Sequence, residues 1–266
     1  GDFSGALVYV NDLEGKITKI NLTNLRGNFA FNAASGVVSQ GSGQSVALYD
    51  NYTFFDLQAS SSNNRYMYHA MDAGIGQNGN FWLYGSTGNY MNLSDTGIFD
   101  PDNNVKNVMF GIKDFYYPFF GSRSSTTGTI DTLANCKDMT GDNTSCDAAT
   151  KRGWYINLDK ASKVTAEPTL ARGVAYYPIF KPVRNNTECG SGVAYVCGIE
   201  AECGKNLSSE LDPPNASSFG NRDCYKVGTG VLSKVVVFNN NLYANISDKS
   251  NYATKTDIVV IEAIQR

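Results

Sequence analysis

The sequence predicts an all-β protein, and its pattern favours a propeller built of several small sheets. Helical periodicity is nearly absent, and short runs rich in Val, Ile, Tyr and Phe alternate with clusters of Gly, Asn and Asp. A strand–turn–strand unit recurs at residues 8–22, 81–93 and 232–246. Many short strands bounded by turns are typical of sandwiches, barrels and propellers, and the recurring unit favours the last of these. We therefore expect a modified β-propeller of the quinoprotein-like kind, complete or partial, with about four blades in this chain.

The expected strands follow from alternation of apolar and polar residues between turn residues. The clearest case is the run Lys16 to Leu22, which alternates strictly and follows a tight turn at residues 11–15, so the first two strands should form a hairpin. The full set of expected strands is residues 6–10, 16–22, 45–49, 66–70, 80–85, 105–113, 153–158, 174–178, 193–199, 232–238, 241–246 and 257–264.

The chain of 266 residues reads as a single domain, residues 1–266, with two long insertions. No Pro-rich or low-complexity linker divides it. The segments at about 121–151 and 181–223 are polar and are expected as surface loops. Since the sequence begins with Gly-Asp-Phe rather than Met, we expect a fragment of a larger protein.

Cysteine usage predicts disulfides and an oxidising compartment. The six cysteines all lie within the polar part of the sequence, at Cys136, Cys146, Cys189, Cys197, Cys203 and Cys224. None forms a C-x-x-C pair, so a zinc ribbon or a thioredoxin-type site is not expected. Three disulfides are expected, with reduced buried cysteines as the alternative. Many pairings remain open; Cys136–Cys146 is favoured because a nine-residue loop closes at little entropic cost, and Cys189–Cys197 with Cys203–Cys224 is the most local choice for the rest.

Charge and hydropathy exclude two classes of partner. The formal net charge is −3 and the isoelectric point is about 5.2, which argues against general nucleic-acid binding, because that needs a basic face. No apolar run approaches the roughly 20 residues that a membrane-spanning helix requires. We expect an extracellular or cell-surface protein.

The sequence offers no set of catalytic residues, so we expect a protein that is not an enzyme. His69 is its one histidine, and no G-x-S-x-G nucleophile elbow is present. The G-x-G-x-x-G match at residues 74–79 precedes an aromatic strand rather than a helix, which indicates a glycine turn between strands and not a dinucleotide site.

Calcium is the candidate cofactor. Asp100, Asp102 and Asn104 resemble the start of a calcium loop, but the EF-hand positions for Gly and Glu are held by Val105 and Gly111. A solvated turn is therefore the competing interpretation.

Five segments, in order, resemble the C-terminal propeller of the PilY/PilC family of type IV pilus tip-associated proteins. They are residues 8–17 (VYVNDLEGKI), 81–90 (FWLYGSTGNY), 108–114 (VMFGIKD), 153–158 (GWYINL) and 227–233 (VGTGVLS). The resemblance spans almost the whole chain.

The resemblance implies a fimbrial, non-enzymatic factor at the pilus tip or cell surface that supports pilus assembly, opposes retraction and mediates adhesion. Its implied partners are major or minor pilins and a host or surface receptor. It also implies a calcium loop before the first hairpin, of which Asp2 would be a middle ligand, although Phe3 and Ala6 replace other expected loop residues.

Two other interpretations compete with the pilus-tip one. A structural subunit of an extracellular filament would pair its blades across protomers. A quinoprotein-type dehydrogenase would need an enclosed cofactor site, usually with adjacent cysteines, and no Cys-Cys pair occurs in the sequence.

Overall fold

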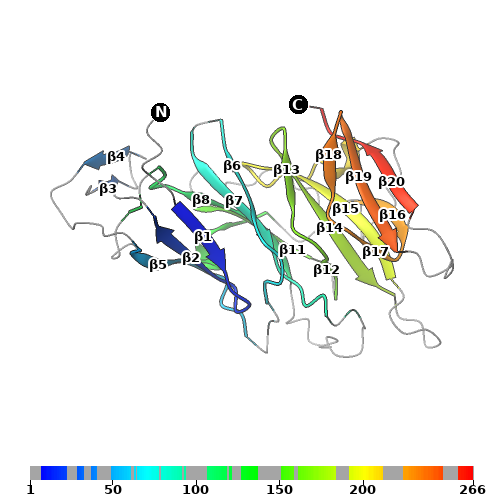
Figure 1. Ribbon diagram of the computed structural model, residues 1–266, viewed down its shortest axis with the longest axis horizontal. Coiled ribbons are helices and arrows are strands. Elements are labelled where there is room, and N and C mark those ends of the chain that lie inside the picture. The colour runs from blue at the N-terminus through cyan, green and yellow to red at the C-terminus, as the bar shows by residue number, and fades with distance from the viewer. Residues whose placement is uncertain are drawn as a thin grey trace.

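A computed structural model gives the architecture of the chain. It describes residues 7–22, 29–32, 37–40, 49–60, 63, 65–77, 79–91, 93, 107–118, 120–121, 127–136, 151–158, 161–183, 192–211, 224–247 and 257–265. The described part is all-β, as expected, and forms four main sheets arranged one beside the next from the blue end to the red end of Figure 1. None of the four closes on itself.

Sheets 1 and 2 contain the N-terminal half of the chain. In sheet 1 the strands run in the order β1 (Leu7–Asn11), β2 (Lys16–Asn21), β5 (Asn51–Asp56) and β9 (Gly128–Thr129). In sheet 2 the order is β10 (Ala134–Asn135), β11 (Gly153–Asn157), β8 (Val108–Asp114), β7 (Phe81–Ser86) and β6 (Asp72–Ile75). A separate hairpin pairs β3 (Phe29–Asn32) with β4 (Val37–Gln40).

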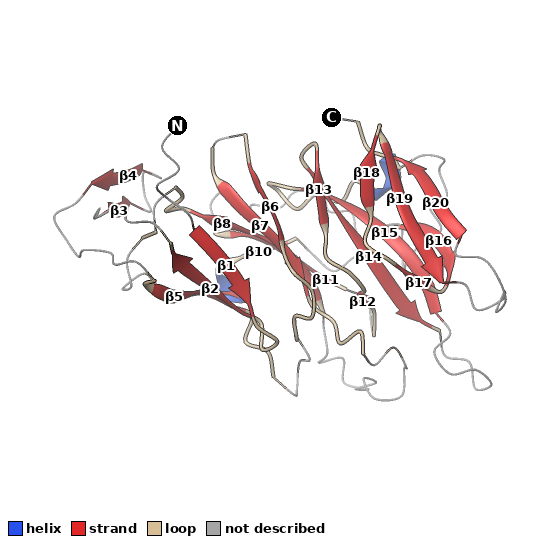
Figure 2. Cartoon of the chain, viewed as in Figure 1, coloured by secondary structure: helices blue, strands red, loops and turns tan. Residues whose placement is uncertain are grey.

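Sheets 3 and 4 contain the C-terminal half. Sheet 3 has the order β12 (Lys163–Val164), β14 (Val174–Pro182), β15 (Gly192–Glu200) and β16 (Tyr225–Thr229), and β13 (Thr169–Ala171) also pairs with β14. In sheet 4, β19 (Asn241–Ser247) is central and pairs with β17 (Val231–Leu232), β18 (Val236–Phe238) and β20 (Asp257–Glu262). Two 3₁₀ turns, η2 (Ile130–Thr132) and η3 (Ser208–Glu210), are the helical elements drawn in Figure 2.

Each sheet packs on the next through an apolar core, so the two inner sheets are apolar on both faces. Strand β8 is buried along its whole length. Because successive side chains point to opposite faces, Phe110 enters the core shared with sheet 1, whereas Met109 enters the core shared with sheet 3. Strand β14 does the same one sheet later, with Tyr177 facing sheet 2 and Tyr176 facing sheet 4. The strongly apolar inner strands follow from this double burial.

Hydrogen bonds also join sheets 2 and 3. The Tyr177 hydroxyl donates to the carbonyl of Phe110 at 3.0 Å, and the Trp154 indole N–H donates to the carbonyl of Ala201 at 2.7 Å. Both side chains lie within the core. These bonds therefore satisfy hydrogen-bond donors that would otherwise be buried without a partner.

The first hairpin is confirmed. Strands β1 and β2 pair antiparallel from Leu7↔Asn21 to Asn11↔Ile17, and Gly15 takes a φ of +78° in the turn. The Asp12 carboxylate accepts the backbone N–H of Lys16 at 2.9 Å, which is the usual use of Asp in a turn.

The glycine-rich motif is also confirmed as a turn. It connects β6 to β7, and Gly79 has a φ of +75°. A helix that could bind a dinucleotide does not follow, because β7 begins at Phe81.

Three strand expectations are wrong or incomplete. Residues 66–70 are not a strand; their alternation reflects a loop that packs Met67 into the core of sheets 1 and 2. The expected strand at 232–238 is divided into β17 and β18, which lie beside opposite ends of β19. Most of 45–49 lies outside the described residues, and the local strand is β5, which begins after Tyr49 adopts a φ of 68°.

The expected insertions contribute to the sheets. In the segment 121–151, β9 pairs with β5 of sheet 1 and β10 pairs with β11 of sheet 2. In the segment 181–223, β15 is a central strand of sheet 3. Over the residues that the structure describes, no helix has the length and apolar character needed to cross a membrane.

Candidate functional site

The most unusual chemistry among the described residues is a cluster of buried and half-buried charged and hydroxyl groups between sheets 1 and 2. We call Tyr9, Lys19, Asp114 and Arg152 the charge cluster. The Lys19 Nζ atom lies 2.5 Å from Oδ2 of Asp114, and neither side chain is exposed to solvent. The Tyr9 hydroxyl donates a hydrogen bond to the same Asp114 oxygen.

Strand geometry explains why these residues meet. In β2, Ile17, Lys19 and Asn21 occupy the buried face because side chains alternate along a strand. Tyr9 lies opposite Lys19 on β1, where the two residues are register partners. Asp114 is the last residue of β8, so sheet 2 brings its carboxylate to Lys19 from the other side of the core.

The turn after β8 fixes the Asp114 carboxylate. Its Oδ1 atom accepts the backbone N–H of Tyr116 at 2.9 Å, while Oδ2 faces Lys19 and Tyr9. Arg152 precedes β11, and its carbonyl accepts the backbone N–H of Lys113 at 2.7 Å, which holds Arg152 beside the end of β8.

Aromatic rings surround the cations of the charge cluster. The Lys19 ammonium lies 5.6 Å from the centre of the Tyr9 ring and 5.9 Å from that of Phe120. The Arg152 guanidinium lies 4.7 Å from the centre of the Phe54 ring. Such contacts partly replace the water that a buried cation loses.

Burial shifts the protonation of these groups. Desolvation lowers the pKa of Lys19; the charge of Asp114 opposes this, and the charge of Arg152 adds to it. Desolvation, together with the Asp114 carboxylate, raises the pKa of Tyr9 far above its ordinary value. Burial also lowers the pKa of Arg152. A lysine and a hydroxyl with shifted pKa values, both in contact with one carboxylate, are the kind of set found at reactive sites.

A second set of buried polar side chains, which includes Thr87 and Asn107, has a structural role rather than a chemical one. The Thr87 hydroxyl accepts the backbone N–H of Val108, and the Asn107 amide donates to the carbonyl of Ser162 at 2.9 Å. Gly88 has a φ of +148°, and a Cβ atom there would lie 2.7 Å from Cβ of Lys163. These contacts hold sheets 2 and 3 together at a place where the backbone segments approach so closely that position 88 has no room for a side chain.

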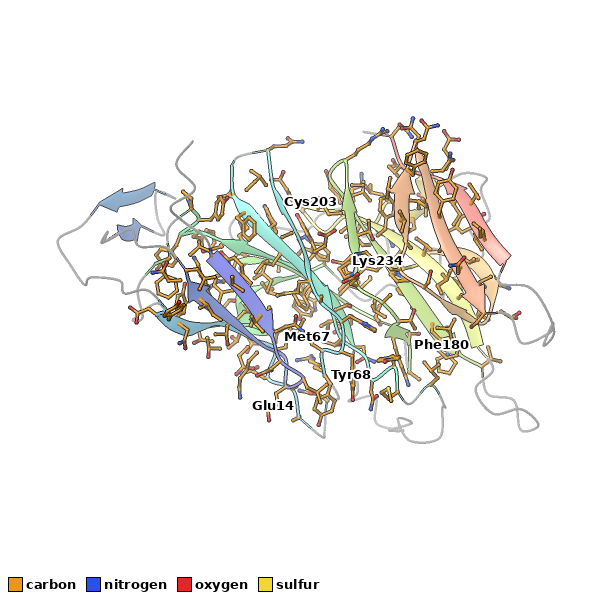
Figure 3. The ribbon with its side chains drawn as sticks, viewed as in Figure 1. Glu14, Met67, Tyr68, Phe180, Cys203 and Lys234 are labelled. Atoms are coloured by element: carbon orange, nitrogen blue, oxygen red, sulfur yellow. A yellow bond between two sulfur atoms is a disulfide. The ribbon has the colours of Figure 1, made fainter. Side chains whose placement is uncertain are left out.

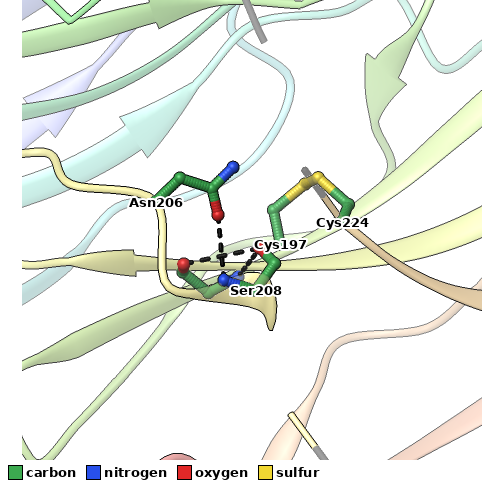
Figure 4. The surroundings of a disulfide bond; sticks show 5 residues. Cys197, Asn206, Ser208 and Cys224 are labelled. Carbon is green, nitrogen blue, oxygen red and sulfur yellow. Dashed lines mark hydrogen bonds between the residues drawn. A yellow bond between two sulfur atoms is a disulfide. The ribbon is translucent and has the colours of Figure 1, made fainter. Parts of the chain in front are cut away.

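The disulfide pairing differs from the most local expectation. Cys197 of β15 bonds to Cys224, which directly precedes the neighbouring strand β16 (Figure 4). The expected pairs Cys189–Cys197 and Cys203–Cys224 are therefore wrong. Register explains the result: Val196 pairs with Tyr225, so the sheet itself places the two sulfur atoms side by side.

The expectation of three disulfides is also wrong, because Cys203 carries a free thiol. That thiol donates to a Glu200 carboxylate oxygen at 2.8 Å, in the turn after β15 that Figure 3 marks. Burial and this hydrogen bond raise the pKa of the Cys203 thiol to about 11, which makes it a poor nucleophile.

Cys136 is disulfide-bonded as well. Its partner lies outside the described residues, which leaves Cys146, the expected partner, and Cys189. The favoured pair Cys136–Cys146 thus stays a prediction.

The calcium candidates cannot be placed. Asp2, Asp100, Asp102 and Asn104 all lie outside the described residues. Within the described ranges, no group of three or more His, Cys, Asp or Glu side chains could hold a metal ion.

His69 is half-buried in a loop. Its ring centre lies 5.1 Å from that of Tyr90, and its carbonyl accepts the side-chain amide of Asn11 at 3.2 Å. Desolvation lowers its pKa, and only the charge of Glu167 opposes the shift. These contacts resemble those of a packed loop histidine.

Reasoning from the sequence did not identify the charge cluster. Lys19 lies in a strand with lysines on both faces, since Lys16 and Lys19 are three apart, so alternation alone cannot tell which one is buried. Asp114 ends one of the five family-like segments, and that motif by itself indicates only a strand. Ile17 is the usable signal. It lies two residues before Lys19 and so on the same face of the strand, and an apolar residue there indicates that this face is the buried one.

Comparison with known proteins adds no assignment. No protein-family model matches the sequence, and no curated protein matches it significantly.

Proposed function

We propose that this chain is a non-enzymatic, extracellular factor of the type IV pilus tip, which supports pilus assembly, opposes retraction and contributes to adhesion. In this proposal the four sheets are blades of a modified β-propeller, and the loops between strands contact pilins or a surface receptor.

One observation supports the proposal most directly. The five family-like segments fall on regular elements of successive sheets. Residues 8–17 cover the β1–β2 hairpin of sheet 1, and residues 81–90, 108–114 and 153–158 include β7, β8 and β11 of sheet 2. Residues 227–233 join β16 of sheet 3 to β17 of sheet 4. If the resemblance extends to the fold, the matching segments should lie on strands of several sheets rather than in one loop.

The covalent chemistry is compatible with an oxidising location outside the cell. Cys197–Cys224 closes a loop of 27 positions at the edge of sheet 3. Disulfides of this kind persist in secreted and surface proteins and are rare in reducing compartments.

A filament subunit is the second candidate, and one surface favours it. The outward face of sheet 4 carries four exposed apolar side chains, Val236, Phe238, Ile258 and Val260, of which Phe238 is 70% exposed. Register places Val236 and Val260 in one row across β19, on either side of Tyr243. An apolar sheet face of this type suits contact between protomers.

Immunogold electron microscopy of surface filaments distinguishes these functions. Gold confined to filament ends is the expected result. Gold along the whole length would overturn the tip assignment in favour of a filament subunit. Gold on no filament would overturn both.

A loop variant tests the adhesive role separately. Deleting residues 124–150 would also remove Ile130 and Leu133, which are buried in the core of sheets 1 and 2, so that change would damage the fold. Replacing only residues 138–144 with Gly and Ser retains Cys136 and Cys146. We expect reduced surface attachment with normal piliation, and the exposed variant Lys234→Ala serves as the matched control. Unchanged attachment would exclude this loop as the receptor contact.

A further inference from the structure

Lys19 and Asp114 bring an amine and a carboxyl group into direct contact in a site from which solvent is excluded. The two residues lie 95 positions apart in the sequence and belong to different sheets. The Lys19 Nζ atom lies 2.5 Å from the carboxyl oxygen Oδ2 of Asp114, and both side chains are fully buried.

We propose that Lys19 and Asp114 condense after folding into an intramolecular amide bond that joins β2 of sheet 1 to β8 of sheet 2. The chain would thus modify itself at the charge cluster. This inference does not rest on the proposed pilus role.

The surroundings supply the nucleophile. Condensation needs a neutral amine, and burial, aided by the nearby charge of Arg152, lowers the pKa of Lys19 in spite of the opposing effect of Asp114. Transfer of one proton from the ammonium to Asp114 converts the ion pair into an amine and a carboxylic acid. A medium of low dielectric constant favours that neutral pair relative to two separated charges.

Two donors are placed to activate the carboxyl group. The backbone N–H of Tyr116 lies 2.9 Å from Oδ1 of Asp114, where it can stabilise the negative charge that develops when the carbonyl carbon is attacked. The Tyr9 hydroxyl already donates to Oδ2, the oxygen that has to leave, and can relay to it the proton that the amine loses. Each oxygen of the carboxyl group therefore has the donor that its role requires.

The step balances without any further reactant. The Lys19 nitrogen bonds to Cγ of Asp114, and the bond from Cγ to Oδ2 breaks. The amine retains one hydrogen in the amide, and its other hydrogen, relayed through Tyr9, leaves with Oδ2 and the acid proton as one molecule of water. No oxidant or reductant takes part.

Two other lysine–carboxylate pairs of the described chain provide a comparison. Lys16 and Glu14 are 2.9 Å apart with side chains 43% and 69% exposed, and Lys234 and Glu167 are 2.7 Å apart and also exposed. Water solvates these groups and opposes a reaction that releases water. Contact distance is similar in all three pairs, so burial singles out Lys19 and Asp114.

Intact-mass spectrometry of the natively folded, purified chain tests the proposal, after reduction and alkylation under denaturing conditions. The expected mass is below the mass of the alkylated sequence by one water molecule. A tryptic digest should contain a branched peptide in which residues 17–26 are joined to residues 114–123, with Lys19 protected from cleavage. Full sequence mass, with the two peptides recovered separately, would overturn the proposal and leave a buried ion pair. Loss of water within a single unbranched peptide would overturn it too.

Variants identify the participating groups. Lys16→Met, an exposed lysine of the same strand, should still lose one water molecule, whereas Lys19→Met should show its full sequence mass. Because Lys19→Met could reduce folding, Tyr9→Phe provides a second measurement. It retains both reacting groups, and the rate of crosslinking should fall about 100-fold if the hydroxyl relays the proton. An unchanged rate would remove Tyr9 from the reaction.

Discussion

The contact between sheets 1 and 2 and the contact between sheets 3 and 4 join similar sheets in different ways. In the first, Lys19 and Asp114 lie beside a core of mixed aliphatic and aromatic side chains, and both are fully buried. In the second, the core consists mainly of aliphatic side chains, such as Val196, Leu242 and Ile261. Apolar packing tolerates many sequences of similar volume, whereas a buried charge tolerates only a partner in the right place. The first contact should therefore specify the relative position of its sheets more strictly than the second.

The largest expected effect comes from removing one member of the ion pair. Asp114→Ala leaves Lys19 without its carboxylate in a dry core and should lower the free energy of unfolding by about 3–5 kcal/mol. Loss of the proposed amide would add to this. The measurement is unfolding in urea, monitored by tryptophan fluorescence. A loss below about 1 kcal/mol would show that this contact resembles a surface ion pair.

Truncating a side chain in the aliphatic core between sheets 3 and 4 should lower the free energy of unfolding by nearly as much. A substitution that conserves volume should avoid most of this loss. Leu242→Ala should cost about 2–5 kcal/mol because it leaves a cavity between sheets 3 and 4. Leu242→Met, which conserves volume, should cost less than about 1.5 kcal/mol. Equal losses for the two variants would contradict the tolerance ascribed to this contact.

Removing the disulfide of sheet 3 should have an intermediate effect. The double variant Cys197→Ala with Cys224→Ala opens a loop of 27 positions and should lower stability by about 2–4 kcal/mol. Differential scanning calorimetry provides the measurement. Cys203→Ala is the matched control, since it removes a thiol without opening a loop. A comparable loss of stability in that variant would show that the disulfide is not the cause of the effect.

The pKa of His69 gives a smaller effect with a definite sign. Burial lowers it below the ordinary 6.5, so the unfolded chain binds the proton more readily than the folded one. His69 therefore contributes stability above pH 6.5, and this contribution declines as the pH falls from there toward the lower folded pKa. Because the chain has one histidine, NMR titration reads its pKa directly. A value above 6.5 would reverse the predicted sign, and His69→Gln should remove this part of the pH dependence.

The smallest effect is expected at the surface. Lys234→Ala breaks an exposed ion pair with Glu167 and should change stability by no more than about 1 kcal/mol. Urea unfolding under the conditions used for Asp114→Ala makes the comparison direct. A larger loss would mean that exposure is a poor guide to the strength of the charged contacts in this protein.

Local signals predicted much of the strand framework. The strict alternation of residues 16–22 and the turn before it located the first hairpin, and the aromatic run after Gly79 located β7. Strands as short as β9 and β12, of two residues each, have too few positions to show a period. They exist because neighbouring strands offer hydrogen-bonding edges.

The site was harder to predict than the strands, because it depends on contacts between distant parts of the chain. Lys19 and Asp114 meet only once two sheets stack, and neither has a local pattern that marks it as buried and reactive. The pairing of Cys197 with Cys224 is similar: it follows from the register of β15 and β16, which spacing between cysteines does not encode.

The short strand β9 has a consequence for how the chain reaches its folded form. It completes sheet 1 by pairing parallel to β5, and the Thr127 hydroxyl donates to the carbonyl of Thr53 at 3.0 Å across 74 positions of sequence. During synthesis, the edge of β5 must therefore wait until most of sheet 2 has emerged from the ribosome. Contacts of such separation form late and slowly, and an open strand edge attracts other chains in the meantime. Strands β1, β2 and β5 are translated first, but sheet 1 should become resistant to proteases only after β9 has emerged, and chaperones should protect the edge of β5 until then.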